Sequence, residues 1–213
     1  MSALTEVSTC VALLADVVDS RRGNRTRTHR AILNAIDATN DAVSALDPLR
    51  VTVGDEVQGV YAHMGEALHA AFHLRQALHG EVALRFGLGG GQVRVVDSER
   101  GIQDGTAWYL AREAIEWVEQ LATKPGHASA RTAIRDERPV ATPAADALAR
   151  LVDAHLARLR DGARRSLNGL VTGLDNATVA AEEGITPSAN SQRVNTNDLK
   201  ALADAILALT TLP

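Results

Sequence analysis

The chain has 213 residues, 46% of them apolar, and a formal net charge of −4. This length suits one large domain or two small ones, and the apolar share is enough for a folded core rather than a disordered chain. The acidic balance argues against general nucleic-acid binding through a basic surface. Cys10 is the only cysteine, which fits a reducing cytosol. The first apolar stretch, 11–15, is too short for a signal sequence or a membrane span, so we expect a cytoplasmic protein with no membrane partner.

The first part of the chain alternates strand and helix patterns. Residues 11–18 form an apolar run closed by turn residues, which indicates a central strand buried on both faces. Residues 28–46 carry apolar side chains at helical spacing, and 50–61 predict two short strands around a Gly-Asp turn. Further patterns predict a helix over 65–78, a strand over 82–96, a helix over 105–121 and a strand over 128–134. This order predicts an α+β fold with a ferredoxin-like βαββαβ sheet and additions.

The last part of the chain shows only helical patterns. Residues 138–143 have the composition of a linker. The helices are expected over 144–160, 164–172, 177–183, 188–194 and 198–209. We therefore divide the chain into a sheet domain over 1–138 and an all-α domain over 143–213.

Two aspartates stand at the ends of neighbouring predicted strands. Asp16 closes the first strand and Asp55 lies at the tip of the hairpin. Carboxylates brought together repel and raise each other's pKa, which a divalent cation relieves. Mg²⁺ prefers one or two carboxylates with phosphate oxygens and water, and two such ions can assist a phosphoryl transfer. The alternative, from spacing alone, is that each aspartate is only a strand-end or turn residue.

Four blocks of sequence carry a family resemblance. The block 15–20, Ala-Asp-Val-Val-Asp-Ser, resembles the first strand of class III nucleotidyl cyclases. The block 53–57, Val-Gly-Asp-Glu-Val, resembles their Gly-Asp hairpin and the GGDEF hairpin of diguanylate cyclases. The block 85–93 resembles their glycine-rich strand, and 104–112 resembles the helix that follows it. Together with the helical end, the blocks resemble the SatD family most closely.

This resemblance implies a nucleotide site with a metal. Asp16 and Asp55 would bind Mg²⁺ or Mn²⁺, and the nucleotide would be an NTP or a derivative. Its phosphates would meet the turn after the first strand. The nucleotide-binding residues there would be Val17, Val18, Asp19, Ser20, Arg21 and Arg22.

The resemblance also implies catalytic roles, with one departure. Arg112 matches the arginine that steadies the transition state in class III cyclases, and Asp16 and Asp55 match their catalytic aspartates. The asparagine that orients the ribose is replaced by Trp108, whose indole only donates. Trp108 either stacks on a base or belongs to the core. Glu56 matches the second acidic residue of GGDEF, or is an outward-facing hairpin residue. We therefore expect nucleotide and metal binding with weak or no cyclase turnover.

Residues 176–194 resemble a helix-turn-helix. Gly184 fits the turn, and Asn190 lies where such helices usually bury Val or Ile. The residues expected to face a DNA groove are Ser188, Ser191, Gln192 and Arg193. From Pro143 onward there are seven basic and eight acidic side chains, so DNA binding would require a homodimer. The alternative is a helical protein–protein module of the same shape.

These observations favour a nucleotide- and metal-binding regulator of transcription, in which a cyclase-like sensor domain controls a DNA-binding helix-turn-helix. One alternative is an active two-metal nucleotidyl cyclase or transferase that makes a cyclic or linear nucleotide signal from NTP. The other is a non-catalytic protein-interaction module. Asp16 and Asp55 favour the first two over the third, and Trp108 favours the regulator over the enzyme.

Overall fold

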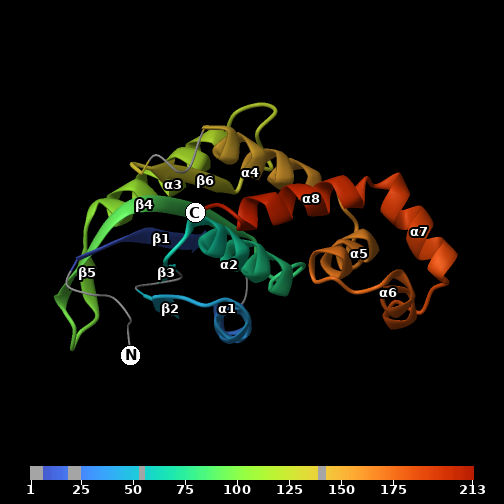
Figure 1. The fold of residues 1–213 in the computed structure, drawn as a ribbon, viewed down its shortest axis with the longest axis horizontal. Coiled ribbons are helices and arrows are strands. Elements are labelled where there is room, and N and C mark those ends of the chain that lie inside the picture. Colours follow the sequence, from blue (N-terminus) through green and yellow to red (C-terminus); the bar gives the residue numbers. More distant parts are fainter. Residues whose placement is uncertain (1–6, 19–24, 53–55, 139–142) are drawn as a thin grey trace.

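The centre of the molecule is a six-stranded sheet. A computed structural model describes residues 7–18, 25–52, 56–138 and 143–213 (Figure 1). The strands are β1 (Val7–Val17), β2 (Asp47–Val51), β3 (Val57–Tyr61), β4 (Leu84–Asp97), β5 (Ile102–Asp104) and β6 (Thr132–Asp136). They follow the order β2-β3-β1-β4-β5, and β6 also pairs with the long strand β4. The β4–β6 pair is parallel and the other pairs are antiparallel.

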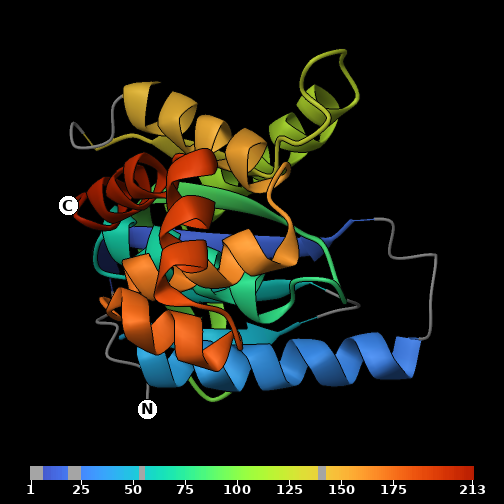
Figure 2. The same cartoon turned by 90° about the vertical axis from the view of Figure 1, so that its right-hand side faces the viewer.

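Helices cover both faces of this sheet, so the fold is mixed α+β. They are α1 (Arg25–Ala42), α2 (Met64–Ala77), α3 (Thr106–Ala122), α4 (Pro143–Leu156), α5 (Asp161–Val171), α6 (Asn176–Glu182), α7 (Pro187–Thr196) and α8 (Leu199–Thr210). Helix α3 lies on one face and α1 and α2 on the other, while α5, α6 and α7 gather at one end of the molecule (Figures 1 and 2). In the part of the chain that the structure describes, no helix is long and apolar enough to cross a membrane.

The alternation of side chains along β1 assigns its residues to the two layers. Leu13 and Ala15 belong to the larger hydrophobic cluster, which includes α1 and α2. Ala12 and Leu14 belong to a smaller cluster with α3. Asp16 continues the series of Ala12 and Leu14, so its side chain lies on the α3 face of the sheet.

The glycines of β4 allow α3 to lie directly against the sheet. A Cβ atom at Gly87 would come within 2.2 Å of the carbonyl oxygen of Ala111. At Gly89 it would come within 2.1 Å of the carbonyl oxygen of Ala107. Real side chains do not make such contacts, so the glycine-rich sequence is explained by the close packing of α3 on β4.

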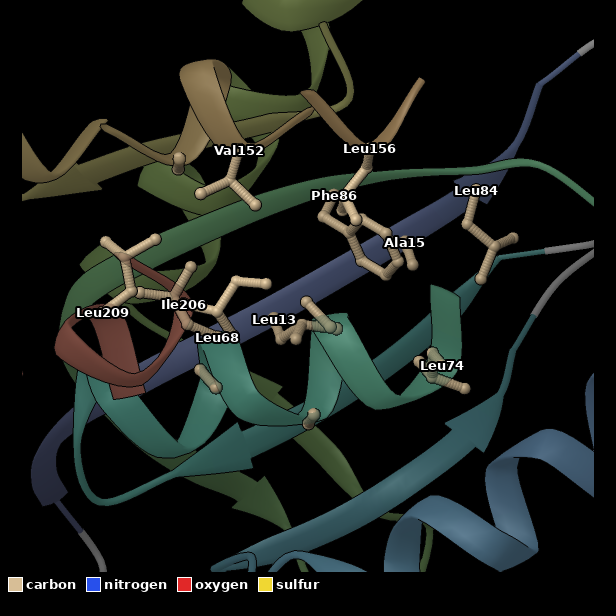
Figure 3. Close-up of a cluster of buried hydrophobic side chains, with 14 of the residues drawn as sticks. Leu13, Ala15, Leu68, Leu74, Leu84, Phe86, Val152, Leu156, Ile206 and Leu209 are labelled. Carbon is tan, nitrogen blue, oxygen red and sulfur yellow. The ribbon is translucent and has the colours of Figure 1, made fainter. Parts of the chain in front are cut away.

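The hydrophobic core continues from the sheet into the C-terminal helices. Val152 and Leu156 of α4 project toward Phe86 of β4 (Figure 3). Ile206 of α8 lies beside Leu68 of α2 in the same cluster. The end of the chain is also fixed, because Gly65 N–H donates to the carbonyl oxygen of Leu212 at 2.9 Å. The expected domain boundary therefore does not interrupt the core.

Most of the predicted elements are confirmed, with differences at their ends. The helix expected over 28–46 ends at Ala42, because Asp47 and Pro48 begin β2 rather than stopping the helix. Asp47 pairs with Val60 of β3, so contacts with a neighbouring strand place Asp47 and Pro48 in β2 and outweigh the local stop signal. The short strand β5 was not predicted. It returns along β4, where Arg94 pairs with Asp104 at 3.2 Å.

Candidate functional site

Asp16 lies opposite Arg85 in the register between β1 and β4. Arg85 Nη1 donates to the Oδ2 atom of Asp16 at 3.1 Å and to its Oδ1 atom at 3.3 Å. The same Nη1 atom lies 3.1 Å from Oε1 of Glu119 on α3. Arg85 is buried, with 9% of its surface exposed, so these two carboxylates balance a charge that is largely removed from water.

A second ion pair lies on the other side of β1. Ala15 is paired with Val57, which places Glu56 next to Asp16 across the strands. Arg112 Nη2 lies 2.7 Å from Oε2 of Glu56. Arg112 and Glu119 are seven residues apart on α3, so two turns of one helix face the end of β1.

These side chains form one charged cluster, consisting of Asp16, Glu56, Arg85, Arg112 and Glu119. Three carboxylates face two guanidinium groups, which leaves one negative charge in excess. Burial raises the pKa of Asp16, Arg85 opposes this rise, and the carboxylates of Glu119 and Glu56 add to it. The ionised form of Asp16 is therefore disfavoured in the folded protein, and a bound cation would relieve it.

Asp16→Asn is expected to gain stability relative to the wild type as the pH rises from about 4 to 7. The pKa of Asp16 is raised in the folded state, so ionisation begins to destabilise the fold above the unfolded value of about 3.9. Asparagine removes that destabilisation. The measurement is the urea midpoint of both proteins across this pH range.

Asp97→Asn provides a control of opposite sign. The Arg100 backbone N–H lowers the pKa of Asp97, so its ionised form stabilises the fold, and this variant should lose stability relative to the wild type as the pH rises. If the two variants respond to pH in the same direction, the electrostatic description of Asp16 is wrong.

Trp108 packs with Leu46 against the small hydrophobic cluster on the α3 face. Its indole Nε1 is buried and has no hydrogen-bond partner among the described residues. An unpaired buried donor costs about 1–3 kcal/mol. Trp108 lies one helical turn before Arg112 on α3.

Several of the expected nucleotide-binding residues lie outside the described residues, as does one metal ligand. They are Asp19, Ser20, Arg21, Arg22 and Asp55. Val17 ends β1. The N–H of Val18 donates to the carbonyl oxygen of Ala83 at 2.9 Å, so in this arrangement it is already used and does not point at a phosphate.

The four residues expected to meet DNA have different environments. Ser188, Ser191 and Gln192 are exposed on α7. Arg193 is half-buried, and its Nη1 donates to the carbonyl oxygen of Gly162 at 2.9 Å and lies 3.0 Å from Oε2 of Glu183. Arg193 therefore fixes α7 against α5 and the end of α6.

Asn190 is buried, and both polar atoms of its amide form a hydrogen bond. Its Oδ1 atom accepts from the Ser166 hydroxyl at 2.7 Å, and its Nδ2 atom donates to Oδ1 of Asn176 at 2.9 Å. These bonds offset the loss of water, so an amide is tolerated where an apolar side chain is usual.

Arg85 and Glu119 belong to the cluster although neither was predicted as a site residue. Arg85 is a charged residue within an otherwise apolar and glycine-rich run, opposite an acidic strand end. Glu119 follows Arg112 by two helical turns. Both signals were present in the sequence, but the strand register was needed to connect them.

The donor atoms of this cluster suit a hard divalent cation, since carboxylate oxygens are the ligands that Mg²⁺ prefers. Among the described residues, no group of three or more His, Cys, Asp or Glu side chains could hold a metal ion. Of the two predicted metal ligands, Asp16 lies in this cluster and Asp55 lies outside the described residues.

The sheet, its two helical layers and the charged cluster define a mixed α+β protein with an acidic site at the end of β1. The SatD family model matches residues 10–205, and the chain belongs to the SatD family. No curated protein matches the chain.

Three solved structures are distantly similar to this chain. The guanylyl cyclase domain of the RhoGC fusion protein from the aquatic fungus Blastocladiella emersonii is 15% identical, with a TM-score of 0.40, over 51% of this chain and 76% of that chain. A bacterial light-regulated adenylyl cyclase is 15% identical, with a TM-score of 0.40, over 61% of this chain and 77% of that chain. A regulator of polyketide synthase expression from Bifidobacterium adolescentis is 13% identical, with a TM-score of 0.32, over 97% and 82%. Similarity this distant assigns no activity to the present chain.

Proposed function

We propose that this protein is a nucleotide- and metal-binding regulator whose site at the end of β1 takes an NTP or a derivative together with Mg²⁺ or Mn²⁺. The observation that supports this most is Asp16. Its carboxylate is partly buried, its pKa is raised, and Glu56 and Glu119 leave the cluster with excess negative charge. A divalent cation bound by Asp16 and Asp55 neutralises this charge and the charge of the phosphates.

The strand order supports a ferredoxin-like, nucleotidyl-cyclase-like sheet as the basis of this site. β1 lies between β3 and β4, and the chain runs β1, α1, β2, β3, α2, β4. Glu56 precedes β3 and is close enough to Asp16 to affect its pKa. Asp55 is the residue before Glu56 in the sequence, which supports it as the second carboxylate of the metal site.

The arginines of the cluster have separate roles in this proposal. Arg85 is buried and held by two carboxylates, so it positions Asp16. Arg112 has about half of its side chain exposed (48%) and, among the described residues, forms one ion pair, with Glu56. It is therefore the cation that can exchange its carboxylate for a ligand phosphate.

We favour binding over turnover because of Trp108. It stands where the related cyclases have an amide that orients the ribose, and its ring is packed against the hydrophobic cluster. A missing transition-state donor costs roughly 10²–10³ in rate in well-studied enzymes. The regulator is thus the first candidate, and a two-metal nucleotidyl cyclase or transferase is the alternative.

Nucleotide binding is tested by the ligand-induced change in melting temperature. ATP or GTP with Mn²⁺ should raise the melting temperature of the wild type, with a stabilisation of about 2.7 kcal/mol when the ligand concentration is a hundred times Kd. Asp16→Asn and Asp55→Asn should lose this rise. Asp204→Asn, an exposed carboxylate on α8, should keep it.

Two results would count against this proposal. One is a rise that does not need the metal, and the other is a rise that survives in both Asp16→Asn and Asp55→Asn. Formation of a cyclic product by the wild type, abolished in Asp55→Ala, would instead establish the enzyme alternative.

The C-terminal helices support a second role, in DNA binding by a homodimer. Asp175 caps α6, Thr186 caps α7, and Gly184 between them has a φ of +64°. This arrangement supports a helix-turn-helix within a helical domain over 143–213. On α7 the exposed polar residue Gln192 is the candidate for reading a base, while Arg193 steadies the helix through Glu183.

Selection from a random DNA library at low salt tests this second role. The wild type should enrich a two-fold symmetric sequence, and Gln192→Ala should bind that sequence more weakly by about 1–3 kcal/mol, the usual contribution of a bidentate base contact. Lys200→Ala removes an exposed basic residue outside α7 and should have less effect. A library with no enriched sequence favours the protein-interaction module.

A further inference from the structure

A cavity of 390 Å³ lies on the face of the sheet opposite to Asp16. It is open to solvent and is lined by the end of α2, the start of β4, the end of α4 and the start of α5. Its ionisable lining consists of Arg75, His79, Glu81, Arg131, Asp153 and Arg164. The volume falls within the range of small-molecule sites, roughly 300–1,000 Å³.

The charge balance of this cavity is positive. Asp153 is buried and its carboxylate forms an ion pair with Arg75. It also accepts hydrogen bonds from the backbone N–H groups of Arg131 and Thr132, at 2.7 and 2.8 Å. The other carboxylate, Glu81, is about half exposed (47%) and is screened by water. Three guanidinium groups thus share the cavity with one buried carboxylate.

Among the described residues, Arg164 forms no ion pair within hydrogen-bonding distance, although the charge of exposed Asp161 acts on it. Arg164 is half-buried, and its Nη2 atom donates only to the carbonyl oxygen of Leu156. Its Nε atom is buried and has no hydrogen-bond partner in the described structure. Burial and the charge of Arg75 lower the pKa of Arg164, and the charge of Asp161 only partly opposes this shift. Two cationic groups therefore repel each other across a partly dry space, and an anion between them would relieve this repulsion.

We propose that this cavity binds the phosphate group of a small molecule, with Arg164 and Arg131 as its principal ligands. A guanidinium presents planar, paired donors that match phosphate oxygens. Arg131 already donates to the carbonyl oxygens of Ala128 and Ala130, at 2.9 and 2.7 Å, so its orientation is fixed in advance. Arg75, held by Asp153 and stacked 5.4 Å from the centre of the Phe86 ring, adds charge to the site.

This site is distinct from the proposed metal site. It uses none of the residues of the charged cluster and needs no divalent cation. Arg164 lies on α5, which leads directly into α6 and α7. A phosphate held by Arg164 and Arg131 therefore connects α5 to the segment before β6. The C-terminal helices would then respond to a ligand that does not bind at the proposed metal site.

Binding of inorganic phosphate to the full chain tests this proposal. The measurement is made in EDTA, so that no divalent cation is bound, and at constant ionic strength. The wild type should show saturable binding by calorimetry. Arg164→Gln and Arg131→Gln should each weaken it at least about tenfold, as expected for loss of a charge-assisted hydrogen bond. Arg165→Gln should bind like the wild type, because exposed Arg165 pairs with Glu183 and does not line the cavity.

Two further ligands distinguish free phosphate from a phosphate ester. If AMP binds more tightly than phosphate and adenosine does not bind, the natural ligand is a phosphate ester. If AMP and phosphate bind equally, the natural ligand is the free phosphate ion. Circular dichroism of each variant checks folding, and Arg164→Lys, which keeps the charge, should retain part of the affinity. The proposal is overturned if the wild type binds neither phosphate nor AMP, or if Arg165→Gln weakens binding as much as Arg164→Gln.

Discussion

Gly89→Ala is expected to destabilise the protein by about 3 kcal/mol, at the upper end of the usual effect of overpacking a core. The new methyl group would lie 2.1 Å from the carbonyl oxygen of Ala107 and 2.3 Å from the backbone nitrogen of Ala111. Both are main-chain atoms of α3, so no side chain can turn away. The whole helix must move off β4, which also moves Arg112 and Glu119 away from the rest of the charged cluster. Urea unfolding followed by circular dichroism measures this loss.

Gly59→Ala is the matched control, since Gly59 also lies inside a strand of the same sheet. Its new methyl group would meet the Leu49 side chain at 3.0 Å, which can adjust. We expect a change within about 1 kcal/mol there. Equal losses in the two variants would show that close packing of α3 is not the reason for glycine at position 89.

Asp153→Ala is expected to destabilise the protein by about 3–5 kcal/mol, the usual loss when one partner of a buried ion pair is removed. Asp153 is 3% exposed. Its carboxylate pairs with Arg75 and accepts from the N–H groups of Arg131 and Thr132. Without this carboxylate, the largely buried guanidinium of Arg75 loses its ion pair. The backbone N–H groups of Arg131 and Thr132, at the start of β6, lose their acceptor.

The measurement is again the free energy of unfolding in urea, with Asp204→Ala as the control. Asp204 is an exposed helical aspartate, so its removal should change stability by no more than about 0.5 kcal/mol. A loss below about 1 kcal/mol in Asp153→Ala would mean that Arg75 finds another partner, and that the apolar contacts of α4 and the bond from Ile134 N–H to Asp146 suffice to hold α4 to the sheet.

The elements of this fold could be predicted because their patterns are local. The five C-terminal helices follow apolar spacing and turn residues, and the glycine-rich strand stands out from its neighbours. The end of α1 and the start of β2 at Asp47 could not be predicted in this way. Asp47-Pro48 is a stop signal in isolation, and only pairing with β3 turns it into the start of a strand.

The candidate site was predictable to a smaller extent. Asp16 was identified because it closes an apolar strand, and Arg112 because it matches a family motif. Arg85 and Glu119 were missed, since their importance depends on the β1–β4 register and on the position of α3. Arg193 was expected to face DNA from its place in the helix-turn-helix pattern and its residue type, while its ion pair with Glu183 depends on how α7 packs, which no local pattern records.

The central claim is that a divalent cation and a nucleotide meet at Asp16. Crystals grown with Mn²⁺ and a non-hydrolysable nucleoside triphosphate, measured near the manganese absorption edge, test it most directly. We expect an anomalous difference peak about 2.1 Å from the Asp16 carboxylate, the distance typical of a small hard cation, with phosphate oxygens in the same coordination shell. A nucleotide bound with no manganese peak at Asp16, or bound only elsewhere in the molecule, would contradict this account.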